Sequence, residues 1–435
     1  MVADSPAESS VAPPVRAADR LRSILAGSAG NLVETYDWFV YAAFALYFAK
    51  VFFPDGDQTA QLLNTAAVFG VGFFARPVGA WLMGLYGDRV GRKAAMVASV
   101  SLMCFGSLII ALCPGYAEIG AWAPAILVTA RILQGVSMGG EYGTSATYMS
   151  EMAGRDNRGF WSGIFYSTLI GGQLLAVGTL VALNALLSDD DMQAWGWRVP
   201  FFIGGALALA VFWFRRGMHE TPSFHARTGE RVSTWKLIST HPRESLLVIG
   251  LTAGGTLGYY TYSTYIQKFL VNTSGFSKDT ATAITACALV VFMLAQPLFG
   301  MLSDRVGRRP LLIAFGVAGV TLTWPILSTL AGTRDPLAAF AITAGALLIV
   351  AAYSSVNGVV KAELFPTEVR ALGVALPYSL ANALFGGTAE YVALWFKSKG
   401  HETWFFTYVT VVIGASLLVY IFMRDTRKHS RILED

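Results

Sequence analysis

Long apolar runs recur along almost the whole chain, and they constrain its fold more than any other feature of the sequence. Each run is close to the roughly 20 residues that an α-helix needs to cross the hydrocarbon core of a bilayer. Only 14% of the 435 residues are charged and 54% are hydrophobic, whereas a soluble domain carries about 25% charged residues. The sequence therefore predicts an all-α membrane protein with twelve transmembrane helices. The predicted helices cover residues 23–53, 60–85, 94–114, 121–150, 159–187, 197–215, 245–272, 280–302, 310–331, 336–360, 370–396 and 402–423.

Lysine and arginine residues are distributed unevenly between the two sides of this predicted bundle. The two terminal segments and the even-numbered connections carry 23 of the 32 basic residues, and the odd-numbered connections carry seven. Connections rich in lysine and arginine stay in the cytoplasm. Both termini are therefore predicted to be cytoplasmic.

The same pattern divides the chain into five parts. Residues 1–22 form a predicted cytoplasmic N-terminal tail, which lacks the apolar core of a signal peptide and is expected to be disordered. The two six-helix halves cover 23–215 and 244–424, and a cytoplasmic linker, 216–243, joins them. A cytoplasmic C-terminal tail covers 425–435.

The two halves carry a repeated basic loop. GLYGDRVGRK at 84–93 returns as GMLSDRVGRR at 300–309, an offset of 216 residues. A second repeat, a glutamate followed seven residues later by an arginine, returns at an offset of 212. Two halves repeated in the same orientation are typical of one class of transporter, which holds its substrate near the membrane midplane between the halves.

The repeated acids and bases are predicted to form a latch at the cytoplasmic face. The aspartate of each loop stands at a helix end, where it can pair with arginine or interact with a helix N-terminus. Surface ion pairs contribute little individually, which suits a contact that must open repeatedly. The alternative is that the basic residues only anchor the loops on the positive side of the membrane. The predicted latch comprises Asp88, Arg89, Arg92, Glu151, Arg158, Asp304, Arg305, Arg308, Glu363 and Arg370.

The repeated loop resembles the signature of the major facilitator superfamily, and RILQGVSMGGE at 131–141 resembles its fourth-helix motif. GNLVETYDWFVY at 30–41 and ARPVG at 75–79 resemble the metabolite:proton symporter branch. Longer stretches, such as GGEYGTSATYMSEM and FGGTAEYVAL, are most similar to the bacterial alpha-ketoglutarate permeases of that branch. The resemblance implies the major facilitator fold and a bacterial inner membrane. Thr35 departs from the branch, which usually has an aromatic residue there.

Six acidic or basic residues are embedded in the predicted spans, well away from the span ends. A charge at the bilayer centre costs at least ~2.5–3.5 kcal/mol, so embedded charges are functional candidates. An arginine stays charged and binds a carboxylate through two parallel hydrogen bonds. Arg76 and Arg131 could therefore hold a dianion, Arg198 is a weaker second-cation candidate, and all three could instead be structural. The embedded acids, predicted to couple protons, are Asp37, Glu34, Glu141 and Glu390.

Uptake of a dianion into a negative cell is opposed by about 2.3 kcal/mol per charge per 100 mV, and cotransported protons remove this penalty. A carboxyl group beside an arginine favours its charged form, so an acid could take up a proton when the substrate competes for its arginine. Polar side chains of other predicted spans could complete a substrate pocket, or they could only form hydrogen bonds between neighbouring helices. These candidates are Tyr166, Gln173, Tyr262, Gln267, Asn357 and Asn382.

The embedded charges favour a secondary active transporter that couples protons to uptake of a small dicarboxylate, and the resemblance implies that this substrate is 2-oxoglutarate. A proton symporter for another organic acid or an osmolyte is the alternative, and a membrane sensor that moves nothing is a distant one. The sequence shows no nucleophile–base set, metal-ligand spacing or phosphate loop, so no enzyme activity, cofactor or metal is expected. The expected partners are an organic acid dianion, protons and the lipid bilayer, without nucleic acid, and the protein is expected to work as a monomer.

Overall fold

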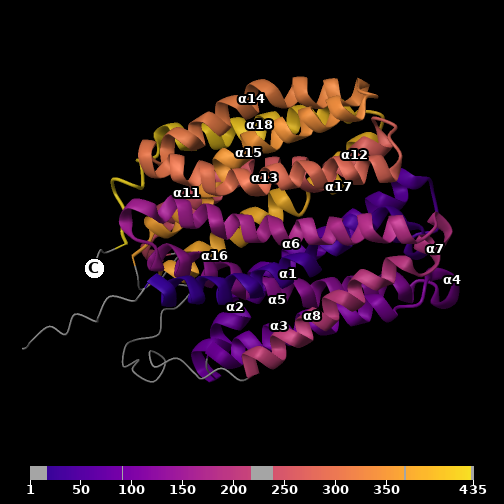
Figure 1. The fold of residues 1–435 in the computed structure, drawn as a ribbon, viewed down its shortest axis with the longest axis horizontal. Helices are drawn as coiled ribbons and strands as arrows, with labels where there is room; N and C mark the ends of the chain where they lie inside the picture. The colour runs from indigo at the N-terminus through magenta and orange to yellow at the C-terminus, as the bar shows by residue number, and fades with distance from the viewer. Residues whose placement is uncertain (1–16, 91, 217–238, 367–368, 433–435) are drawn as a thin grey trace, which may run out of the picture.

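The computed structural model describes residues 17–90, 92–216, 239–366 and 369–432. Within these ranges twelve helical segments lie side by side and form two halves of six (Figure 1). The predicted fold class is therefore confirmed. The first half contains α1 (Ala17–Phe52), α2 (Gln58–Val90), α3 (Arg92–Leu112), α5 (Trp122–Met152), α6 (Arg158–Leu186) and α8 (Val199–Arg216).

Two segments of the second half are each interrupted by one π-helical turn, a feature that is frequent at functional sites. The turn η3 (Thr261–Tyr265) divides α11 (Pro242–Tyr260) from α12 (Ile266–Asn272). The turn η4 (Asn382–Gly386) lies between α16 (Arg370–Ala381) and α17 (Ala389–Ser398). The other helices of this half are α13 (Lys278–Val306), α14 (Arg308–Gly332), α15 (Pro336–Leu364) and α18 (Glu402–Phe422).

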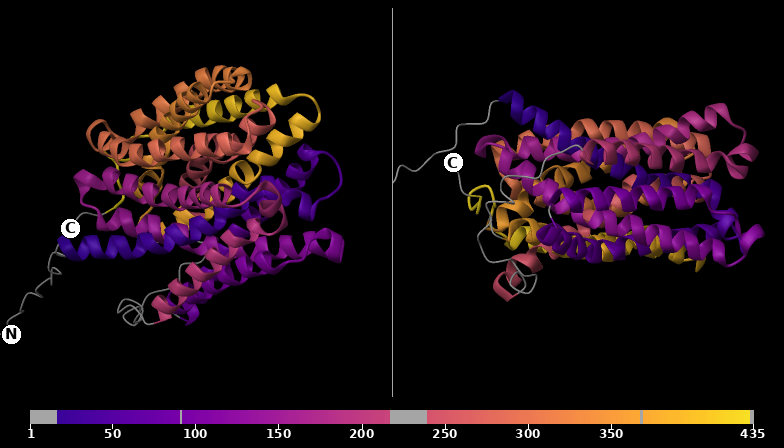
Figure 2. Two further views of the ribbon diagram at one scale, coloured as in Figure 1. Left: turned by 45° about the vertical axis from the view of Figure 1, so that its right-hand side comes forward. Right: turned by 90° about the horizontal axis from the view of Figure 1, so that it is seen from below.

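The two ends of the bundle differ. The C-terminal residues and the turn between α13 and α14 lie at one end, which we call the tail end (Figures 1 and 2). The short helices α4 (Tyr116–Ile119) and α7 (Asp189–Ala194) lie at the opposite end. The short 3₁₀ turns η1 (Arg155–Asn157) and η2 (Gly196–Arg198) precede α6 and α8.

Seven of the described helices are long and apolar enough to cross a membrane by length and composition alone. Several of the others carry the polar features seen in the sequence, such as Glu34 and Asp37 in α1 and Arg131 in α5. These helices can cross a bilayer because the bundle buries the three side chains.

The halves meet through close helix contacts, chiefly α6 against α13, α2 against η4 and α17, and α5 against α16. At the crossing of α6 and α13, a Cβ atom added to Gly159 would lie 2.5 Å from the carbonyl oxygen of Gly300. Only glycine allows the two backbones to approach this closely. Gly307 ends α13 with a positive φ of 100°, a conformation that glycine adopts readily.

Most helix bounds lie within a few residues of the predicted spans, with one larger difference. Helix α1 begins at Ala17 rather than at residue 23, so the last residues of the predicted disordered tail are helical. A helix satisfies its own backbone hydrogen bonds and can extend beyond the bilayer. The rest of that tail and residues 217–238 of the predicted linker lie outside the described residues.

Candidate functional site

A small cavity of about 70 Å³ lies between the two halves. Contacts between the halves lie on both sides of it. Toward the tail end, the rings of Tyr142 and Tyr378 stack with their centroids 4.0 Å apart, and toward the opposite end the Lys268 ammonium donates to the carbonyl oxygen of Ala42 at 2.8 Å. The cavity is lined by Thr35, Phe39, Arg76, Met138, Tyr142, Tyr166, Leu169, Thr256, Tyr259, Tyr260, Tyr353, Ser354, Asn357, Tyr378, Ser379 and Asn382.

Arg76 on α2 is the arginine that lines this cavity. Its side chain is 7% exposed, and its guanidinium carbon lies 4.1 Å from the ring centroid of Trp38 and 4.3 Å from that of Phe73. One terminal nitrogen donates to the sulfur of Met138 at 3.4 Å, and Nε has no partner. None of the carboxylates described in the structure forms an ion pair with Arg76. The cavity therefore contains a buried cation whose charge no described acid balances.

Asp37 on α1 lies in a separate polar cluster inside the first half. Its Oδ2 accepts hydrogen bonds from Ser107 and, at 2.9 Å, from Nε2 of Gln134. Gln134 Oε1 accepts a hydrogen bond of 2.7 Å from Arg131. Asp37 and Arg131 are both fully buried and neither lines the cavity, so Gln134 connects the acid to the base without a direct ion pair.

Trp38 lies between this buried cluster and the cavity. The guanidinium carbons of Arg76 and Arg131 each lie 4.1 Å from the ring centroid of Trp38. Such cation–π contacts offset part of the loss of hydration of a buried guanidinium. One aromatic residue thus contacts both the cavity cation and the arginine that is linked to Asp37.

Tyr166 and Asn357, predicted from different halves, are brought together at the cavity. The Tyr166 hydroxyl lies 2.7 Å from that of Tyr142 and accepts a hydrogen bond from the Asn357 amide. Oδ1 of Asn357 and the hydroxyl of Thr35 are buried without a hydrogen-bond partner in the described structure. Unpaired polar groups that line a cavity are available to bind a polar ligand.

The other candidates for proton coupling and binding lie away from the cavity. Glu390 forms a buried ion pair with Lys268 at 3.0 Å near the end opposite the tail end. Gln173 donates to the carbonyl oxygen of Ser263 in η3 at 2.8 Å, and so joins the halves. Glu34 is buried in α1 one residue from Thr35, and Gln267 donates to Thr282 at 3.0 Å. Tyr262 is buried in η3 outside the cavity lining.

Arg198 has a structural position. It donates to the carbonyl oxygens of Ala111 at 3.0 Å and of Cys113 at 2.6 Å, at the C-terminal end of α3. Its guanidinium carbon lies 4.2 Å from the ring centroid of Trp197. A cation at a helix C-terminus stabilises the last carbonyl groups, so the geometry corresponds to the predicted anchor rather than to a substrate contact.

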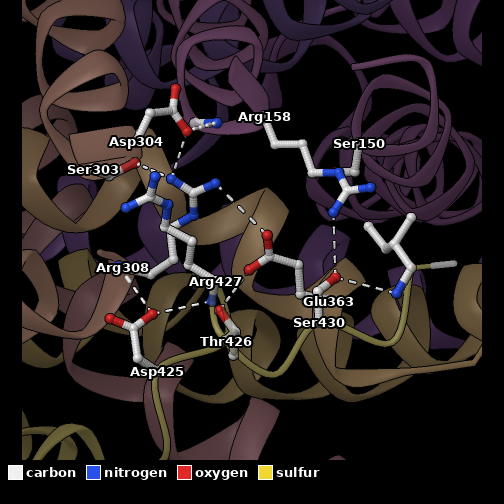
Figure 3. A network of polar contacts seen from close by, with 12 residues as sticks. Ser150, Arg158, Ser303, Asp304, Arg308, Glu363, Asp425, Thr426, Arg427 and Ser430 are labelled. Atoms are coloured by element: carbon white, nitrogen blue, oxygen red, sulfur yellow. Dashed lines mark hydrogen bonds and ion pairs between the residues drawn. The ribbon is translucent and has the colours of Figure 1, made fainter. Parts of the chain in front are cut away.

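Three residues of the predicted latch, Asp304, Arg308 and Glu363, lie together at the tail end (Figure 3). Asp304 on α13 accepts hydrogen bonds of 2.8 Å from the backbone nitrogens of Gly159 and Phe160 at the start of α6. Arg308 pairs with Asp304 at 2.7 Å and with Glu363 at 3.7 Å. The repeated aspartate therefore bonds the N-terminal end of a helix in the other half, as the sequence suggested.

The C-terminal residues add to this network. Thr426 donates to Glu363 at 2.6 Å, and Arg158 donates to Ser430 at 3.4 Å (Figure 3). Arg370 donates to the carbonyl oxygens of Phe365 and Arg431. Of the remaining latch candidates, Arg305 is exposed and its carbonyl oxygen accepts a hydrogen bond from Arg427. Five of the residues predicted for the latch or for proton coupling have side chains outside the described part of the chain: Asp88, Arg89, Arg92, Glu141 and Glu151.

Four residues of these clusters were not singled out from the sequence. Gln134 stands in the fourth-helix motif three residues after Arg131, and this spacing places both on one helix face. Ser107 has no local signal. Lys268 lies near the end of the predicted span 245–272 and Lys361 just after the span 336–360, so neither was counted as an embedded charge, but both are fully buried. Their positions near the ends of long apolar runs, with no other charge beside Lys268, were the available signal.

Two packed six-helix halves, with a small cavity and an unbalanced cation between them, are the arrangement of a membrane transporter with a central site between its halves. The sequence pattern of the family described as sugar (and other) transporter matches residues 23–240 and 225–432, which is nearly the whole of each half. The chain belongs to this transporter family, and it is not an enzyme.

Comparison with individual proteins shows which members of this transporter family the chain resembles. The chain is 50% identical over 413 residues to the alpha-ketoglutarate permease of Escherichia coli K12, covering 95% of this chain and 96% of that one. It is 33% identical to the citrate-proton symporter of Klebsiella pneumoniae, covering 85% and 83%. A solved structure of XylE, a major facilitator superfamily proton:xylose symporter, superimposes with a TM-score of 0.76 at 18% identity, covering 95% and 98%. The predicted superfamily is confirmed.

Proposed function

We propose that this protein couples the uptake of 2-oxoglutarate to the uptake of protons, across a bacterial inner membrane and as a monomer. The permease that shares half of its residues with this chain is named for the same substrate. The site supports an anionic substrate, because Arg76 places an unbalanced positive charge at the cavity. This is the observation that carries the proposal.

Arg76 is the proposed contact for one substrate carboxylate. Its guanidinium group now lies against Trp38 and Phe73, which do not neutralise its charge. Tyr166 on α6 and Asn357 on α15 also line the cavity and supply hydrogen bonds. The cavity has room for only a few water molecules, so the halves must separate to admit a dicarboxylate.

Asp37 is the proposed proton carrier. It is buried apart from the substrate, and it is linked to Arg131 through Gln134. When Arg76 turns toward a bound carboxylate, Trp38 loses one of its two cations, and the packing of Arg131 changes with it. We propose that this movement couples the protonation of Asp37 to substrate binding, because the balance between an acid and its neighbouring base sets the charge of the acid.

The tail-end network is the proposed cytoplasmic latch. The contact of Asp304 with the start of α6 joins the two halves and must break when the protein opens at that end. The excess of lysine and arginine in the terminal segments and even-numbered connections supports a cytoplasmic position for the tail end. On the side of the cavity away from the tail end, the hydrogen bonds from Lys268 to the carbonyl oxygen of Ala42 and from Gln173 to that of Ser263 join the two halves.

Uptake of radiolabelled 2-oxoglutarate into proteoliposomes tests the proposal. The purified protein should accumulate 2-oxoglutarate when the outside is acidic, and an uncoupler that dissipates the proton gradient should abolish the accumulation. Unlabelled citrate and glycine betaine, added as competitors, test the two other substrate classes. Wild-type protein that takes up citrate or betaine but not 2-oxoglutarate would contradict the substrate assignment.

Two variants separate the proposed roles of Asp37 in proton transport and of Arg76 in substrate binding. Asp37→Asn keeps the shape of the side chain and one acceptor, so it should retain exchange of labelled for unlabelled 2-oxoglutarate but lose accumulation driven by a pH gradient. Arg76→Met should lose both activities, because the cavity cation is gone. Accumulation at the wild-type rate by Asp37→Asn would refute its role as the proton carrier.

A further inference from the structure

Lys361 is a buried cation close to the central cavity. Its side chain has no exposed surface, and it lies on α15 one helical turn from Asn357, which lines the cavity. Its ammonium nitrogen lies 3.6 Å from the ring centroid of Tyr378 and 5.3 Å from that of Tyr142. It donates one hydrogen bond, to the Tyr142 hydroxyl at 3.5 Å. Both tyrosines line the cavity.

The other buried basic residues of the described chain have partners of a different kind. Arg131 is linked to Asp37 through Gln134, and Lys268 is paired with Glu390. The buried arginines at the tail end, Arg158, Arg308 and Arg370, all bond within the latch network. Among the described side chains, the buried cations that neither bond an acid, nor reach one through a bridging amide, nor belong to that network are Arg76 and Lys361.

Arg76 and Lys361 share one kind of environment. Each lies against two aromatic rings, and no described carboxylate lies within ion-pair distance of either. Cation–π contact lowers the cost of burying a cation without cancelling its charge. Arg76 comes from the first half and Lys361 from the second, so the two positive charges belong to opposite sides of the interface between the halves.

We infer that Lys361 is the second cation of the substrate site, and that it makes the site selective for dianions over monoanions. This inference rests on the proposed function, since it assigns the second carboxylate of the same substrate. In the present closed state Tyr378 and Tyr142 cover the ammonium group. When the halves separate, the distal carboxylate replaces the tyrosine faces around Lys361, while the first carboxylate stays on Arg76.

Binding of two ligands that differ in one carboxylate tests the inference. 2-Oxoglutarate is a dianion, and 2-oxopentanoate has the same chain with a methyl group in place of the distal carboxylate. Isothermal titration of the purified full-length protein should show that Lys361→Met weakens 2-oxoglutarate binding by roughly 10- to 100-fold, the range for a lost hydrogen bond to a charged group. The binding of 2-oxopentanoate should be unchanged, which also shows that the variant is folded.

Two further variants are matched controls. Lys361→Arg keeps the charge and should keep most of the preference for the dianion. Lys397→Met removes a half-buried lysine that pairs with Glu402 and does not line the cavity, and it should leave both affinities unchanged. The inference is overturned, but the proposed function is not, if Lys361→Met binds 2-oxoglutarate as tightly as the wild type or binds both ligands more weakly by the same factor. Wild-type protein that does not bind 2-oxoglutarate overturns the proposed function as well.

Discussion

Replacing Asp304 by asparagine should shift the protein toward the state that is open at the tail end. Asp304 binds two backbone N–H groups of α6 with its two carboxylate oxygens, each at 2.8 Å. Asparagine has only one acceptor oxygen, so it must lose one of these bonds. The amide also has no charge to interact with the N-terminal end of α6.

The size of the expected shift depends on which contacts of Asp304 break when the halves separate at the tail end. A hydrogen bond to a charged group contributes about 1.5–3 kcal/mol and a neutral one about 1 kcal/mol. The variant loses one hydrogen bond to a charged group and makes the other a neutral one, which destabilises the state with a closed tail end by about 3 kcal/mol. This corresponds to a roughly 150-fold change in the ratio of the open to the closed state. The pair between Asp304 and Arg308 lies within one half, so it contributes to both states and cancels.

Distances between spin labels across the tail end measure this ratio. Labels on cysteines at Asp156, in the first half, and Lys428, in the second, occupy exposed positions, after the three native cysteines are replaced. Asp304→Asn should increase the long-distance population. Asp425→Asn is the matched control, because Asp425 accepts hydrogen bonds from the backbones of Arg308 and Arg427, both in its own half.

Two outcomes would refute this reasoning. The first is an Asp304→Asn distance distribution that matches that of the parent protein. The second is an equal shift in Asp425→Asn, which would mean that any lost charge in the network opens the tail end, whether or not it bonds the other half.

Further predictions concern stability, measured as the thermal unfolding of purified protein in detergent. Lys268→Met should destabilise the protein by about 3–5 kcal/mol because it leaves Glu390 buried without its partner, and adding Glu390→Gln should recover much of the loss. Failure of the double variant to recover would show that the ion pair is not what the single change removes. Gly139→Ala should destabilise by about 1–3 kcal/mol, since its Cβ would lie 2.0 Å from the carbonyl oxygen of Arg76. Gly178→Ala, a helical position with nothing within 4 Å of the added carbon, should be neutral or stabilising, and an equal loss in both glycine variants would contradict the packing argument.

The helices and their repeat were predictable because their causes are local. Apolar runs of membrane length must be helical, since a helix satisfies its own backbone hydrogen bonds where no water is present. In the second of the repeated loops, Asp304 bonds the start of a helix in the other half, which is one of the two kinds of contact expected of it. The π-helical turns η3 and η4 were not predicted, because their sequences, TYSTY and NALFG, contain no proline to mark an interruption.

The candidate site was predicted in part. Arg76, Tyr166 and Asn357 do line the cavity, as does Asn382. Arg131 was a candidate for the substrate that could equally be tied to a neighbouring acid, and in the structure it is buried and linked to Asp37 through Gln134. Depth along a helix can be counted from the sequence, but the direction in which a side chain faces depends on which neighbours pack there.

The sequence by itself determined that this chain is a membrane transporter of two repeated halves, with acids and arginines embedded in its first half. Hydropathy, repeat spacing and motif chemistry are properties of short stretches, and they do not depend on distant contacts. Only the tertiary structure decided which embedded charges are balanced. Lys268 is paired with Glu390, 122 residues away along the chain, whereas Arg76 and Lys361 lie against aromatic rings and form no ion pair with any carboxylate that the structure describes. Charge balance is set by distances between side chains of different helices, and those distances exist only once the helices have packed.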